Sequence, residues 1–66
     1  MSKNDFRAFF AEIKPYVTFA PFLKSVGIAR SNFSLFMKGE PYDYALSLEK
    51  LILLRLSIID FCKKIA

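Results

Sequence analysis

Residues 18–39, TFAPFLKSVGIARSNFSLFMKG, contain two short helical patterns on either side of one glycine. Apolar residues recur at i, i+3, i+4 and i+7 in the first pattern and at i, i+3 and i+4 in the second, the spacing of one helix face. These residues are Phe19, Phe22, Leu23 and Val26, then Phe33, Phe36 and Met37. Gly27 and Gly39 lie just past the two sets, where glycine adopts the left-handed conformation that commonly ends a helix. The stretch predicts a helix-turn-helix, whose second helix can enter the major groove of DNA.

The residues before this stretch predict an amphipathic first helix, with apolar positions at Phe6, Phe9, Phe10, Ile13 and Val17. Ser2 and Asp5 have the spacing of a capping pair, and Asp5 would lie at the positive end of the helix dipole. Pro15 lacks an amide hydrogen and would crowd the carbonyl of the fourth residue before it. The first helix is therefore expected to end near Lys14 or to kink there.

Within residues 18–39, Thr18 is expected to cap the second helix, and Pro21 falls in the first turn, where amide hydrogens are unpaired anyway. The third helix is expected over residues 30–38, with its apolar residues turned inward. Residues 40–46 are expected to form a loop, because Pro41 favours an extended conformation at the residue before it.

The C-terminal segment, residues 47–65, is apolar on too many sides for a helix with one buried face. Ser47 is a good N-cap. Either one helix is covered on both sides, or the segment breaks near residues 55–57. Ser57 and Asp60 have cap-pair spacing, which slightly favours two helices. The surplus apolar residues predict a homodimer interface, formed by Leu53, Leu56, Ile59 and Phe61.

The length of 66 residues predicts one domain spanning residues 1–66. The patterns predict an all-α fold, a compact bundle of four to five short helices containing the helix-turn-helix. The formal net charge is +4, and no acidic residue lies between Ile13 and Gly39. That interval holds Lys14, Lys24, Arg30 and Lys38. A cationic half suits a polyanion, although a solvated basic face is the simpler alternative.

Several classes of function are disfavoured. The chain has no histidine and only scattered carboxylates, so we expect no metal site, no cofactor and no enzymatic activity. Cys62 is the single cysteine, which excludes an internal disulfide and fits a cytoplasmic protein; we expect its thiol to be buried. The N-terminus lacks the apolar core of a signal peptide, and the apolar run 51–54 is too short to span a membrane. A helical peptide lying on a membrane surface is a further alternative, against which the two glycine-ended helices and three prolines argue.

Residues 23–39, LKSVGIARSNFSLFMKG, resemble the helix-turn-helix of the phage repressor family of the lambda repressor and Cro type. Gly27-Ile28 corresponds to the turn of that motif, Phe33 and Phe36 to its two buried positions, and Gly39 to the glycine after its recognition helix. Residues 47–51, SLEKL, are similar to the fourth helix of the family. The resemblance covers about residues 15–54. It implies a bundle of about five helices that binds double-stranded DNA as a homodimer on inverted half-sites, as a transcriptional repressor.

The resemblance also implies roles for individual residues. Arg30, Ser31 and Ser34 would face bases, with Asn32 at the edge of this face, and Leu35 could contact a thymine methyl group. Arginine can hold guanine with two hydrogen bonds. The expected phosphate contacts are Lys38, Lys24 and Thr18.

The chain departs from the family at three points. Leu23 replaces an alanine at a tight contact between helices, and Ala29 stands where the family has a serine or threonine cap. The glutamine that often opens the second helix and touches phosphate is missing. These departures, the acids Glu40 and Asp43 near the expected DNA face, and the apolar C-terminal segment favour an alternative. In it, the domain is a protein-interaction module that binds a second regulatory protein without contacting DNA.

Overall fold

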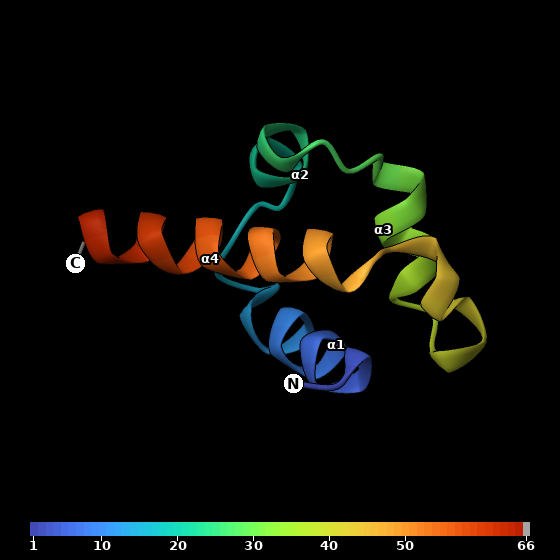
Figure 1. Ribbon diagram of the computed structural model, residues 1–66. Helices are drawn as coiled ribbons and strands as arrows, with labels where there is room; N and C mark the ends of the chain where they lie inside the picture. Colours follow the sequence, from blue (N-terminus) through green and yellow to red (C-terminus); the bar gives the residue numbers. More distant parts are fainter. Residues whose placement is uncertain (66) are drawn as a thin grey trace.

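The longest helix, α4 (Leu48–Ile65), is the element against which two of the other helices pack (Figure 1). The computed structural model describes residues 1–65, in which we find five helices and no strand. In Figure 1, α1 (Lys3–Ile13) lies along one side of α4 and α2 (Ala20–Val26) along the other. The remaining two, α3 (Arg30–Phe36) and the 3₁₀ helix η1 (Glu40–Ala45), lie beyond the N-terminal end of α4. The expectation of an all-α bundle is confirmed.

Phenylalanine rings hold the first three helices together. Phe10 of α1 is completely buried, and four other rings surround it with centroids 5.6 to 6.2 Å away. They belong to Phe6, Phe9, Phe19 and Phe33. Most of these pairs meet edge to face, the arrangement that aromatic quadrupoles favour. From α4, Leu51, Leu54 and Ile58 complete the core.

α1 begins with the predicted capping pair. The Ser2 hydroxyl accepts a hydrogen bond from the Asp5 amide at 3.2 Å, and the Asp5 carboxylate accepts one from the Ser2 amide at 2.8 Å. Hydrogen bonds from Ser2 hold the pKa of Asp5 below its usual value. The bond from the Ser2 amide has the larger effect and the bond from its hydroxyl the smaller. The helix ends at Ile13, two residues before Pro15, as expected.

The prediction that Thr18 caps α2 is wrong. The helix begins at Ala20, and Phe19 occupies the cap position with helical dihedral angles and no capping side chain. Phe19 packs on Phe10 and Phe33, and the helix begins at the residue that follows this aromatic contact. Pro21 lies in the first turn, as predicted.

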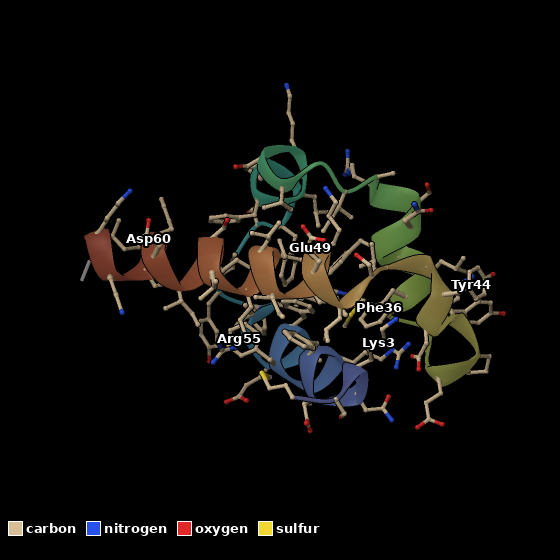
Figure 2. All side chains as sticks on the ribbon, viewed as in Figure 1. Lys3, Phe36, Tyr44, Glu49, Arg55 and Asp60 are labelled. Atoms are coloured by element: carbon tan, nitrogen blue, oxygen red, sulfur yellow. The ribbon has the colours of Figure 1, made fainter. Side chains whose placement is uncertain are left out.

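The slight preference for two helices in residues 47–65 is also wrong, because α4 is continuous. Its interior contains no glycine or proline to break it. Arg55, one of the residues where the break was expected, lies at the edge of the buried face with its guanidinium 5.3 Å from the centre of the Phe9 ring (Figure 2). Its aliphatic stem and this cation–π contact let a charged residue border the core without interrupting the helix. The Ser47 hydroxyl accepts from the Lys50 amide, as a cap does.

Three smaller expectations are corrected. α3 ends at Phe36 rather than Lys38, and residues 40–45 form η1 rather than an irregular loop. Within η1, Tyr42 is half-buried and Tyr44 points into solvent (Figure 2). Cys62 is exposed rather than buried.

Candidate functional site

The outer face of α3 carries polar side chains. Arg30, Ser31, Asn32 and Ser34 are all exposed, and Lys38 is exposed in the turn that follows. Because a helix turns once every 3.6 residues, positions 30, 31 and 34 fall within one arc, opposite the inward rings of Phe33 and Phe36. Asn32 lies to one side of this arc. Leu35 is half-buried, so only part of its side chain is open to a partner.

Of the other two expected phosphate contacts, only one lies near this face. Lys24 is exposed in the last turn of α2, just before the turn that leads to α3. Thr18 is exposed too, but it lines a hollow with Phe22, Phe61 and Cys62, beside the C-terminal half of α4. That half lies at the end of the molecule away from α3 (Figure 1). The structure therefore separates Thr18 from the other expected contacts.

The turn before α3 is built on Gly27. Its φ of 74° and ψ of 38° are left-handed, and its amide donates to the carbonyls of Leu23 and Lys24. The next amide, that of Ile28, also donates to the Leu23 carbonyl at 2.8 Å, and the Ile28 side chain is buried. A β-carbon at Gly27 would lie 3.2 Å from the Lys50 ammonium nitrogen, a tight contact that the flexible lysine could relieve, so the positive φ is the main reason for glycine at this position.

Lys50 of α4 braces this turn. Its Nζ donates to the carbonyl of Val26, the last residue of α2, at 2.8 Å. The final carbonyls of a helix have no partner within the helix, and a cation there also interacts favourably with the helix dipole. This contact fixes the corner from which α3 departs.

Arg7 of α1 secures the other end of α3. Its Nε donates to the Phe36 carbonyl and its Nη2 to the Gly39 carbonyl, both at 2.7 Å. The same Nη2 is paired with the Asp43 carboxylate, and Nη1 donates to the Asn4 side chain at 2.7 Å. The guanidinium also lies 4.1 Å from the centre of the Phe36 ring. Lys50 thus holds the end of α2 before the turn, and Arg7 holds the end of α3.

The sequence interpretation gave neither cation a role. Arg7 directly follows a buried ring, Phe6, and so borders the apolar arc of its helix, which is the only local sign that its charge is buried. Lys50 gives no such sign, because its partner lies 24 residues earlier in the chain.

The acids near α3 are engaged by the protein itself. Asp43 pairs with Arg7, and its backbone carbonyl accepts from the Lys3 ammonium at 2.7 Å. The Glu40 carboxylate accepts a hydrogen bond from the Asn4 amide group. Between Met1 and Ile65 the other ion pair is Asp60–Lys64, on the last turns of α4. The exposed cations on and before α3 therefore have no ion-pair partner in that part of the chain.

The four residues expected at a dimer interface do not share one surface. Leu53, Leu56 and Phe61 are exposed and Ile59 is half-buried. Helical spacing places Leu53 on the side of α4 away from Ile59, and Phe61 turns toward α2, where its ring meets Phe22 with centroids 5.4 Å apart. Leu56 and Ile59 remain neighbours.

Among the described residues no group of acids and cysteines is placed to hold a metal ion. None of the helices in residues 1–65 is both long and apolar enough to cross a bilayer. Comparison of the chain with protein-family models, curated proteins and solved structures finds no match.

Proposed function

We propose that this protein binds double-stranded DNA by placing α3 in the major groove, as a repressor-type transcriptional regulator. The observation that carries the proposal is the shared outward direction of Arg30, Ser31 and Ser34 on a helix whose end is held by Arg7 and whose preceding turn is held by Lys50. Base contacts require side chains held in a fixed geometry, and Lys50 and Arg7 supply that support from outside the helix. α2, the Gly27 turn and α3 would then act as the helix-turn-helix that the sequence resembles.

The dimensions and charge of this face suit DNA. Seven residues make a helix about 10 Å long, and the major groove is about 12 Å wide. Arg30 can donate two hydrogen bonds to guanine, while the short Ser31 and Ser34 side chains let the helix approach the base edges. Lys24 and Lys38, before and after the helix, are placed to meet phosphates. Because Asp43 and Glu40 are engaged by Arg7 and Asn4, they oppose a polyanion less than their positions in the sequence suggested.

The alternative is a protein-interaction module that binds a second regulatory protein. Two observations favour it. The α3 N-terminus has no capping side chain, since Ala29 occupies the cap position. Leu23, at a position where the family has alanine, is buried and enlarges the contact between helices. Both departures concern the stability and the orientation of α3 relative to α2, on which contact with DNA depends.

A fluorescence-anisotropy titration with a mixed-sequence duplex tests the proposal. Binding should weaken steeply with added salt, because each neutralised phosphate releases counterions. Selection of bound sequences from a random pool would then give the preferred site. On that site, Arg30→Ala should lower affinity by about tenfold or more and relax the preference at one base pair.

Lys64→Ala is the matched control. It removes the same single charge from an exposed residue at the far end of α4, so it should leave base preference unchanged. Unchanged binding by Arg30→Ala would show that α3 is not the recognition helix. No salt-dependent binding to any duplex by the unmodified protein would favour the interaction module.

A further inference from the structure

The open side of α4 carries an apolar stripe that no other element within residues 1–65 covers. Leu48, Ile52 and Leu56 follow one another at intervals of four residues, and Ile59 continues the row one turn later. The first three are exposed large apolar residues, as is Met1, which lies beside them. Leu48, Ile52 and Leu56 form a hollow of about 180 Å³ with Met1, Phe6 and Arg55. A contiguous apolar surface of this kind on a small domain marks an interaction site.

We propose that this stripe, defined as Leu48, Ile52, Leu56 and Ile59, pairs with the same stripe of a second copy, the two α4 helices running antiparallel with Leu56 at the two-fold axis. The pairing concerns the chain itself and is independent of whether α3 binds DNA.

Charge along the stripe supports an antiparallel second copy. Glu49 lies about two helical turns before Leu56, and Lys63 about two turns after it, both beside the stripe. In an antiparallel pair centred on Leu56, Glu49 of each copy therefore comes opposite Lys63 of the other. Within residues 1–65 neither side chain has an ion-pair partner of its own chain. Figure 2 shows Glu49 toward one end of α4 and Asp60, three residues before Lys63, toward the other.

Two further features fit this arrangement. Antiparallel helices bring the positive end of one dipole beside the negative end of the other. Arg55 also borders the stripe near its centre, but its guanidinium is drawn toward α1 over the Phe9 ring, which keeps the two positive charges off the axis. The hollow lies along the N-terminal half of the stripe, where Ile59 of the second copy would come close to Ile52.

The pairing can be tested without DNA, by site-directed cross-linking. In a Cys62→Ser background, which removes the native thiol, Leu56→Cys places one thiol near the axis and should form a covalent dimer under mild oxidation or with a short bis-maleimide. Leu53→Cys is the matched control, because Leu53 is similarly exposed (42% against 52% for Leu56) but lies at the margin of the stripe and three residues from the axis, so the two Leu53 thiols of a pair would be farther apart than the two at position 56. Cross-linking through Leu53 as readily as through Leu56 would overturn the proposal, as would a monomer by sedimentation at the concentrations used.

A charge exchange tests the antiparallel direction. Glu49→Lys and Lys63→Glu should each raise the dissociation constant of the dimer about two- to tenfold, as expected for the loss of two symmetry-related exposed pairs, and the double variant should restore it. No recovery in the double variant would exclude the antiparallel pair centred on Leu56. Since none of these measurements contains DNA, their failure would leave the DNA-binding proposal standing, and failure of the DNA titration would leave the pairing standing.

Discussion

Arg7 and Asp43 are unequal partners in one ion pair. The Arg7 side chain is 10% exposed, whereas that of Asp43 is 45% exposed. Without Arg7, the carbonyls of Phe36 and Gly39 lose their donor, and the Phe36 ring loses the group stacked on it. Without the Asp43 charge, Arg7 keeps those carbonyls and Asn4. We therefore expect Arg7→Ala to lower the free energy of unfolding by about 3 kcal/mol and Asp43→Asn by only about 1 kcal/mol.

Urea unfolding followed by circular dichroism measures both losses. Arg7→Lys is the informative control, since it keeps the charge but cannot reproduce the planar fork, and it should fall between the two. Equal losses for Arg7→Ala and Asp43→Asn would mean that Arg7 contributes only through the ion pair, and that the end of α3 does not depend on it.

Asp5 makes the stability of α1 depend on pH in the acid range. Its pKa in the folded protein lies below the value of about 3.9 for an unperturbed aspartate, because Ser2 hydrogen bonds to the charged carboxylate. A lowered folded pKa means that this contribution is complete above about pH 4 and is lost as the pH falls through the folded pKa. Thermal unfolding should thus show Asp5→Asn less stable than the unmodified protein at neutral pH, with the difference vanishing in acid. A difference that persists at low pH would contradict this assignment.

At this scale, the sequence predicted what is local. The Ser2–Asp5 pair and the Gly27 turn each depend on residues within a few positions, so spacing alone reveals them. The Arg7 and Lys50 contacts join residues 29 and 24 positions apart, and nothing near either cation indicates its acceptor. The turn before α3 was therefore predictable from the sequence, but the hydrogen bonds that Lys50 and Arg7 make to this region were not.

Among the elements, α4 shows how an accurate observation led to a wrong interpretation. Its apolar residues do cover too much of the circumference for one buried face, and a break near residues 55–57 was one way to explain this surplus. The structure keeps the helix whole and leaves the surplus residues on its open side. Periodicity indicated that apolar surface was in excess, but not which elements would cover α4 or which side would stay bare.

Substitutions of Ser57 distinguish one continuous helix from two helices, because the two cases predict opposite signs for the change in unfolding free energy of Ser57→Ala. In the middle of a continuous helix, Ser57→Ala should raise the free energy of unfolding by a few tenths of a kcal/mol, and Ser57→Gly should lower it by about 0.5 kcal/mol. If Ser57 instead capped a second helix, alanine would cost about 1 kcal/mol and glycine only a few tenths. Thermal or urea unfolding of both variants decides between these opposite orders.

For the molecule as a whole, pairing through α4 makes stability depend on concentration. Association of folded chains stabilises the native state by mass action, so the thermal midpoint should rise with protein concentration. Leu56→Glu, which places a charge at the axis, should remove this dependence while leaving the midpoint of the dilute protein unchanged, because Leu56 already faces solvent in the single chain. Leu53→Glu should keep the dependence. Scanning calorimetry over a range of concentrations measures both, and a midpoint that is constant for the unmodified protein would contradict the pairing.

The Lys50 contact joins the first turn of α4 to the corner from which α3 departs. The stripe on α4 that would meet a second copy is then rigidly connected to α3, the helix that would contact bases. In a symmetric pair of chains, the distance between the two α3 helices would be fixed by the protein and not by the duplex. Inserting one base pair between half-sites moves and rotates the second target, so such an operator would be rejected although every readable base is intact.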